Sequence, residues 1–234
     1  MGICGVLYVI SLLMSPGALV VRLSLDLFSV NGPPLLLLGA SGAWATFGVG
    51  HWWTILSASL LHGSLLHILF NMLWVRDLAP PVAHLYGAGR MVLIWTAASI
   101  GGFGLSSFAQ RFLSALPFLG PRAQMTVGAS AAIFGLLGAL VCYGRRSGQS
   151  AMRQQVWTWA IVMFVFGIVM PGVDNFAHFG GFAGGYGAAR WMDPLQPQRP
   201  KHVLLALISI AATVLAVVAS ILTFRDFLPY LSAG

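Results

Sequence analysis

The stretch Gly128-Ala129-Ser130-Ala131-Ala132-Ile133-Phe134-Gly135 surrounds a single serine with small and apolar residues. A second stretch, Ala177-His178-Phe179-Gly180-Gly181, places a histidine in similar surroundings further along the chain. Glycines on neighbouring membrane helices remove side chains from the contact, so the two backbones can approach closely. The two stretches therefore predict a serine and a histidine within hydrogen-bond reach, an arrangement suited to nucleophilic chemistry.

The composition of the whole chain is that of a membrane protein. Of its 234 residues, 58% are hydrophobic and only 7% are charged, with a mean hydropathy of +0.87, whereas a soluble domain has about 25% charged residues. These values predict an all-α polytopic membrane protein in contact with the lipid bilayer. The net charge of +7 comes from basic residues scattered between apolar segments, which excludes the single basic patch of a nucleic-acid-binding protein.

Apolar segments separated by polar residues predict seven membrane-spanning helices. A full crossing takes about 20 helical residues, and the fourth and fifth segments are short by this measure. The predicted spans are Ile3–Val21, Ile55–Val75, Met91–Phe108, Val127–Tyr143, Val156–Met170, Phe176–Met192 and Val203–Phe224.

These spans divide into a six-helix core within residues 1–192 and one added helix. A Pro-rich linker at 193–202 leads to residues 203–234, which hold the seventh helix and a short tail. Residues 22–54 contain glycines, prolines and tryptophans and are too broken for a spanning helix. Because tryptophan favours the membrane–water interface, we expect a structured loop there that is partly embedded.

The basic residues predict the orientation of the chain, because cytoplasmic loops are rich in Lys and Arg. An N-terminus in the cytoplasm leaves four basic residues outside, Arg22, Arg111, Arg122 and Arg225. It places the others inside, namely Arg76, Arg90, Arg145, Arg146, Arg153, Arg190, Arg199 and Lys201. We expect a multi-pass protein of the plasma (inner) membrane of a bacterium, with a cytoplasmic N-terminus.

Polar side chains within the second span indicate function, because such residues are costly in a membrane. His67 and Asn71 are four residues apart and share one helix face. From there both side chains can donate hydrogen bonds to an oxyanion. His62 lies just over one turn earlier, nearer the outer surface, and is either part of this group or an interfacial histidine without a role.

The fourth and sixth spans carry the remaining polar candidates. Ser130 and Phe134 share a face of the fourth span, and His178 shares a face of the sixth with Gly181 and Gly185. A histidine next to the serine can act as its general base. Asp174 could orient that imidazole, but an aspartate at the outer start of a span is expected to cap the helix instead.

Three motifs in this order resemble those of the rhomboid intramembrane serine proteases, and the resemblance covers about residues 40–190. They are His62-x4-His67-x3-Asn71, Gly128-x-Ser130-x3-Phe134-Gly135 and Ala177-His178-x-Gly180-Gly181-x3-Gly185. The resemblance implies a rhomboid-like six-helix bundle core that cleaves transmembrane segments of other proteins.

Carried over by position, the resemblance implies that Ser130 is the nucleophile and His178 the general base. The Ser130 amide and the side chains of His67 and Asn71 would form the oxyanion hole, and Phe134 would pack its ring against the catalytic histidine. Residues 22–54 would be the family's membrane-embedded loop, and residues 171–175 the loop above the active site. We expect Gly128, Gly135, Gly181 and Gly185 to be helix-packing glycines.

The chain departs from the family pattern at three positions. Ala131 stands where a glycine usually follows the serine, Thr54 stands where an arginine usually follows tryptophan, and Ala83 replaces a frequent acidic residue. Two other functions stay open at this point. One is a catalytically silent rhomboid relative that binds membrane proteins, and the other is a proton or ion transporter that uses the histidines.

No metal or cofactor site is expected from the sequence. Cys4 and Cys142 are far apart and fit neither a metal-ligand spacing nor a disulfide framework. The expected partners are a transmembrane protein substrate and the lipid bilayer, with no nucleic acid, and the sequence specifies no oligomeric state.

Overall fold

The computed structural model describes residues 1–15, 27–114, 124–170 and 172–225. These residues are almost entirely helical and hold no strand, only an isolated antiparallel bridge between Ser41 and Thr126. A π-helical turn at Trp44–Gly48 and a 3₁₀ turn at Ala58–Leu60 accompany the helices. The helices are α1 (Gly2–Leu13), α2 (Gly32–Leu37), α3 (Thr54–Ser57), α4 (Leu65–Tyr86), α5 (Ala88–Phe112), α6 (Ser130–Arg146), α7 (Ser150–Val169), α8 (Asn175–Trp191) and α9 (Pro200–Phe224).

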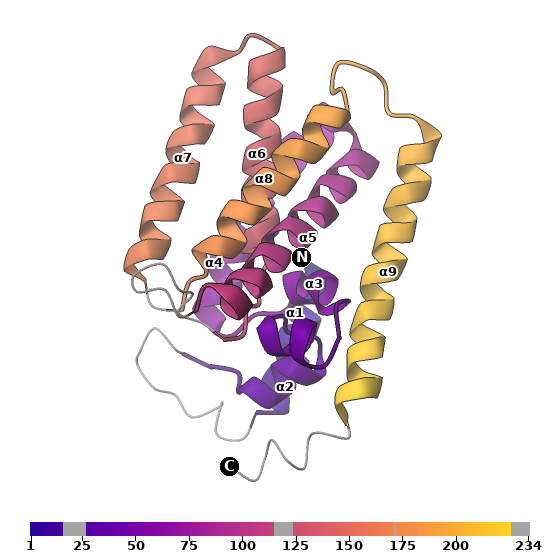
Figure 1. The fold of residues 1–234 in the computed structure, drawn as a ribbon. Coiled ribbons are helices and arrows are strands. Elements are labelled where there is room, and N and C mark those ends of the chain that lie inside the picture. Colours follow the sequence, from indigo (N-terminus) through magenta and orange to yellow (C-terminus); the bar gives the residue numbers. More distant parts are fainter. Residues whose placement is uncertain (16–26, 115–123, 171, 226–234) are drawn as a thin grey trace.

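Helix α6 lies at the centre of the bundle and is buried along nearly its whole length. Helices α5 and α8 pack against it and against each other, and α4 and α7 also contact it. Helix α9 packs against α5, and α1, α2 and α3 gather near one end of the bundle (Figure 1). The bundle therefore places the serine helix α6 beside the histidine helix α8.

Glycines allow α8 to press directly onto the backbones of α5 and α6. A Cβ atom added at Gly185 would collide with the backbone of Gly135, and one added at Gly181 would collide with the Ala131 carbonyl. On the α5 side, a Cβ at Gly101 would come within 2.6 Å of the Gly180 carbonyl oxygen. Gly135, Gly181 and Gly185 thus stand where helix backbones come close together.

The predicted second span is wrong in its position. The segment that was expected to form one helix over Ile55–Val75 is broken, with α3 and the 3₁₀ turn bent by 92° from α4. Helix α4 begins at Leu65 and continues through Pro80 and Pro81 to Tyr86. An average of hydropathy over the whole region hides the short polar stretch His62-Gly63-Ser64, where Ser64 caps α4.

The other spans agree with the structure more closely. By length and composition, α5, α7 and α9 are each able to cross a membrane, and the bent pair of α3 and α4 provides a fourth candidate among the described residues. Helix α7 begins at Ser150, earlier than predicted, and its 20 residues are enough for a full crossing. Helix α1 ends at Leu13, and the rest of the predicted first span lies mostly outside the described residues. Multiple apolar helices make this a multi-pass integral membrane protein.

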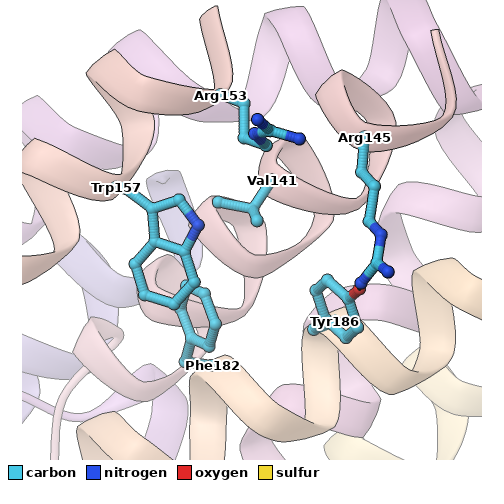
Figure 2. Close-up of a pocket in the computed structure, with 6 residues that line it drawn as sticks. All are labelled: Val141, Arg145, Arg153, Trp157, Phe182 and Tyr186. Carbon is cyan, nitrogen blue, oxygen red and sulfur yellow. The ribbon is translucent and has the colours of Figure 1, made fainter. Parts of the chain in front are cut away.

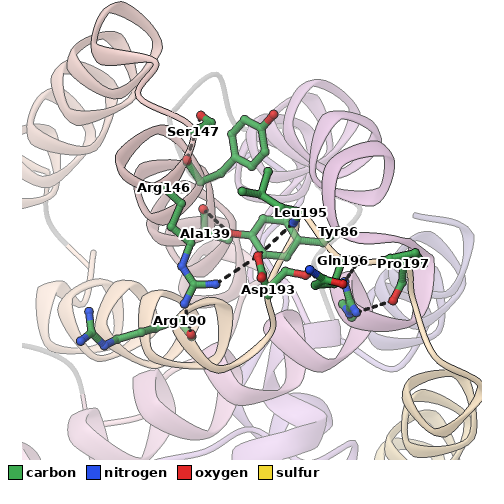
Figure 3. Close-up of polar contacts among 11 residues, drawn as sticks. Tyr86, Ala139, Arg146, Ser147, Arg190, Asp193, Leu195, Gln196 and Pro197 are labelled. Carbon is green, nitrogen blue, oxygen red and sulfur yellow. Dashed lines mark hydrogen bonds and ion pairs between the residues drawn. The ribbon is translucent and has the colours of Figure 1, made fainter.

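A buried arginine holds the segment that leads into α9. The guanidinium of Arg90 donates to the carbonyl oxygens of Asp193, Gln196 and Pro197 at 2.8 Å each, and to His202 Nδ1 at 3.2 Å. These carbonyls belong to the ordered segment seen in Figure 3. Because α9 begins at Pro200, the linker is shorter than the predicted 193–202.

The far end of α9 contacts the region before α4. Trp53 donates its indole N–H to Ser220 Oγ at 3.2 Å. The ring of Phe224 is fully buried and packs edge-on against His51, with the ring centroids 4.6 Å apart. Residues 27–54 are therefore a folded segment, as expected for a structured loop, while the predicted residues 22–26 lie outside the described part.

We expect that Gly185→Ala destabilises the protein by about 1–3 kcal/mol, because the new methyl group meets backbone atoms that cannot move aside. Gly187→Ala is the matched control on the same helix, since a Cβ there would meet no atom within 4 Å. Thermal unfolding in detergent measures both variants. Equal midpoints for the two variants would contradict close packing at Gly185.

Candidate active site

The side chains of Ser130 and His178 meet at one end of the bundle. His178 Nε2 lies 3.0 Å from Ser130 Oγ. Ser130 is the first residue of α6, and His178 stands one turn into α8. His178 is only 7% exposed, so water competes little for its ring nitrogens. This distance is within the range in which a histidine can take a proton from a serine hydroxyl.

The second ring nitrogen of His178 faces Asn175, a residue that the sequence analysis did not assign. His178 Nδ1 lies 3.2 Å from Asn175 Oδ1. A carbonyl oxygen can only accept, so this contact places the imidazole proton on Nδ1. Nε2 is then free to accept the hydroxyl proton of Ser130. Asn175 precedes His178 by three residues on one helix, a spacing that could have identified it.

Phe134 and Gly167 restrict the histidine and its partner from two further helices. The rings of Phe134 and His178 are stacked with centroids 4.3 Å apart and an interplanar angle of 16°. A Cβ added at Gly167 of α7 would collide with Asn175 Oδ1. The ring of His178 is therefore held by a stack on one face and by a hydrogen bond at its edge.

Gly128 brings His67 next to Ser130. Gly128 lies before α6 with a φ of +128°, a conformation that favours glycine. A Cβ added there would lie 2.6 Å from His67 Nε2 and 3.8 Å from Ser130 Oγ. The sequence analysis expects Gly128 to be a helix-packing glycine. In the structure it instead makes room for the imidazole of His67.

The hydrogen bonds of His67 and Asn71 orient both groups. His67 Nδ1 accepts from the Gly63 N–H at 3.4 Å, so the imidazole proton lies on Nε2, the nitrogen next to Gly128. Asn71 Nδ2 donates to the His67 carbonyl at 2.8 Å. An amide nitrogen has two donor hydrogens, and the other one remains available to a ligand.

His62 differs most from its expected place. It lies in the segment between the 3₁₀ turn and α4 and is fully buried within the protein. Its Nε2 accepts from the Ala129 N–H at 3.5 Å, and its ring packs against that of His67 with centroids 5.1 Å apart. His62 therefore supports the turn before Ser130 from behind.

Asp174 caps α8, as predicted. Its Oδ1 accepts from the Ala177 N–H at 3.1 Å. Its Oδ2 accepts from Thr126 Oγ1 at 2.6 Å and from the hydroxyl of Ser106. Asp174 does not contact the imidazole; it fixes the first turn of α8, from which Asn175 and His178 extend.

The hydroxyl groups around Asp174 continue into a buried network that reaches the loop after α2. Gln110 Nε2 donates to both Ser106 and Thr126 at 3.0 Å, and Gln110 Oε1 accepts from the Ala43 N–H at 2.9 Å. Thr126 also forms the backbone bridge with Ser41. Sequence reasoning missed this network, because its residues are far apart in the chain and follow no motif.

The departures from the family pattern are accommodated differently. The methyl group of Ala131 is fully buried and lies where a side chain on Gly102 of α5 would otherwise stand. Thr54 is also fully buried and donates to the His51 carbonyl at 2.8 Å. Nothing in the structure accounts for Ala83, a half-buried residue on α4.

The site has the parts required for acyl transfer without a metal ligand cluster. A serine hydroxyl faces a histidine nitrogen that can accept its proton, and hydrogen-bond donors lie beside the serine. Within the described residues there is no group of three or more His, Cys, Asp or Glu side chains that could hold a metal ion.

Comparisons with known proteins agree with this arrangement. The family model described as "Rhomboid domain" matches residues 49–193. The chain is 34% identical over 191 residues to the rhomboid protease GluP of Bacillus subtilis, covering 80% of this chain and 35% of that protein. It is 36% identical over 138 residues to RHOMBOID-like protein 4 of Arabidopsis thaliana, covering 57% of this chain and 32% of that protein. With the rhomboid protease GlpG of Pectobacterium atrosepticum it shares 31% identity over 144 residues, or 59% of this chain and 48% of the relative. The chain thus spans about a third to a half of the length of these relatives.

The contact with Asn175 predicts the tautomer of His178. We expect ¹⁵N NMR of histidine-labelled protein at neutral pH to show the proton on Nδ1. Asn175→Leu removes the acceptor and is expected to shift a substantial share of the proton to Nε2. The exposed His84 serves as an internal control whose signals stay unchanged. A proton on Nε2 in the unaltered protein would contradict this assignment.

Proposed function

We propose that this chain, which belongs to the rhomboid family, is an intramembrane serine endopeptidase with Ser130 as its nucleophile. The observation that carries the proposal is the 3.0 Å contact between Ser130 Oγ and His178 Nε2. Sequence similarity to proteins named rhomboid protease supports it.

The proposed reaction follows from the positions of the two side chains. His178 Nε2 takes the hydroxyl proton as Ser130 Oγ attacks the scissile carbonyl of a substrate peptide. The imidazolium then returns this proton to the leaving amine, and the acyl group stays on Ser130. A water molecule, deprotonated by the same nitrogen, hydrolyses the ester and regenerates the serine. Asn175 keeps the imidazole in the required tautomer and does not itself react.

We assign the oxyanion hole to three donors around Ser130. They are the Ser130 backbone N–H and the side chains of His67 and Asn71. The first N–H groups of a helix have no acceptor within it, and Ser130 opens α6, so its N–H can donate to the substrate oxygen. A positive partial charge at the start of α6 supports the same negative charge.

The proposed substrate is a transmembrane segment of another membrane protein that enters from the lipid and unwinds locally. The basic residues at the opposite end of the bundle support an orientation in which Ser130 lies toward the outside of the cell. Water would then reach the site from that outer face. We place the protein in a bacterial plasma membrane with its N-terminus inside, the catalytic core within residues 1–192 and the added helix in residues 203–234.

The central prediction concerns the proposed dyad. Ser130→Ala and His178→Ala are each expected to lower cleavage of a transmembrane reporter in liposomes by at least about a thousandfold. Matched controls are Ser209→Ala on α9, whose hydroxyl bonds within its own helix, and His84→Ala at an exposed position; both should keep full activity.

A fluorophosphonate probe separates an active peptidase from a silent relative. Covalent labelling is expected on Ser130 in the unaltered protein and is lost in Ser130→Ala. Full cleavage by either dyad variant, or absence of labelling in the unaltered protein, would overturn the proposal.

The donors of the oxyanion hole make a separate prediction about rate. Asn71→Ala and His67→Ala are each expected to lower kcat about 10²–10³-fold, since one donor to the transition state is lost. KM should change little. His84→Ala, near the other end of α4, is the control. A variant whose KM rises while kcat stays the same would assign that residue to substrate binding instead.

A further inference from the structure

A cavity lies between α6, α7 and α8, far from Ser130. It has a volume of about 490 Å³ and is lined by Val141, Arg145, Arg153, Trp157, Phe182 and Tyr186. Arg145 is fifteen positions beyond Ser130 on α6, which at 1.5 Å per residue is about 22 Å along the helix. In a bilayer whose hydrocarbon core is about 30 Å thick, the cavity lies near the opposite headgroup layer.

Aromatic side chains form the floor of this cavity. Trp157 of α7 and Phe182 of α8 lie against each other with ring centroids 5.0 Å apart. Phe182 in turn stacks on Tyr186, one helical turn later, with centroids 6.5 Å apart. Together with the buried Val141 they form what we call the aromatic floor; Figure 2 shows these four side chains.

Two arginines stand at the rim of the same cavity. Arg145 and Arg153 are both exposed and come from opposite sides of the α6–α7 hairpin, as Figure 2 shows. Gly144 allows this approach, because a Cβ added there would lie 3.0 Å from Arg153 Cβ. On the other side, Arg145 Nη1 lies 3.5 Å from the hydroxyl of Tyr186. The packing thus fixes where both side chains leave their helices.

Among the residues that the structure describes, neither arginine forms an ion pair. The two ion pairs among the described residues use Arg76 and Arg146, and the whole chain has only five acidic residues against twelve basic ones. Two guanidinium groups around one opening favour an anion, and the guanidinium fork matches phosphate geometry. A free phosphate ion would contact the rim alone and leave the aromatic floor open.

We propose that the cavity binds a phospholipid with a net negative headgroup, whose phosphate contacts Arg145 and Arg153 and whose acyl chain lies on the aromatic floor. Basic pockets between membrane helices on the cytoplasmic side are suited to anionic lipids. Such a lipid bridges α6 and α8, the helices that carry Ser130 and His178. The proposal does not depend on peptidase activity.

Native mass spectrometry tests the site with the full chain in an uncharged detergent. The protein is titrated with phosphatidylglycerol or with phosphatidylcholine of the same acyl chains. We expect phosphatidylglycerol to bind more tightly, and the double variant R145Q/R153Q to bind it about thirtyfold more weakly, because two cations near an anionic headgroup are lost. Both residues are exposed, so the variant should fold normally, and its thermal midpoint without lipid checks this.

The control variant R190Q/K201Q removes the same charge from the same end of the bundle but outside the cavity. It should keep phosphatidylglycerol binding within about twofold of the unaltered protein, because neither residue lines the cavity. An equal loss in both double variants, or no loss in R145Q/R153Q, would overturn the proposal. Displacement of the lipid by millimolar inorganic phosphate would identify a site for a free anion and would overturn it as well.

Discussion

Backbone contact between α8 and its two neighbours sets the position of His178. Where glycine meets glycine, as at Gly135 and Gly185, the distance between helices is determined by main-chain atoms. Side-chain rotamers therefore add little uncertainty to it. In a membrane, where apolar side chains gain nothing by leaving lipid for protein, such packing is a main source of helix association. Ser130 and His178 lie close together because α6 and α8, the helices that carry them, lie close together.

The buried polar network also fixes how α8 is rotated about its axis and how far it is shifted along that axis. Asp174 caps the first turn of α8 and so fixes its orientation. The hydroxyls of Thr126 and Ser106 donate to Asp174 and hold its carboxylate in place. Gln110 extends the connection to the loop after α2. Hydrogen bonds in surroundings of low dielectric are strong and directional. The network thus joins four segments that are far apart in the chain.

Much of the bundle follows from hydropathy and motif order, and the motifs single out Ser130 and His178, whose side chains lie together in the structure. Helices α5, α7, α8 and α9 lie where apolar segments predict them. The bend before α4 was not predicted, although the polar stretch His62-Gly63-Ser64 marks it and Ser64 caps α4 by accepting from the His67 N–H. The same bend buries His62 before α4 and beside His67, which favours the first of the two alternatives left open for it.

Two other residues of the site show what local patterns leave out. The role of Gly128 depends on a positive φ and on an imidazole from another helix, and neither is visible in a glycine-rich motif. Asn175 could have been found from its spacing to His178. Its acceptor role, however, depends on the room that Gly167 leaves on α7, and that is a matter of packing between helices.

The hydrogen bonds of Arg90 bear on how the chain folds. Arg90 is 3% exposed, and its acceptors come from residues 193–202, which are synthesised long after α5. Until those residues arrive, the guanidinium has none of these partners, and burying an unpaired charge is costly. The C-terminal segment supplies these partners, so a helix that looks appended in sequence is joined to the core through Arg90.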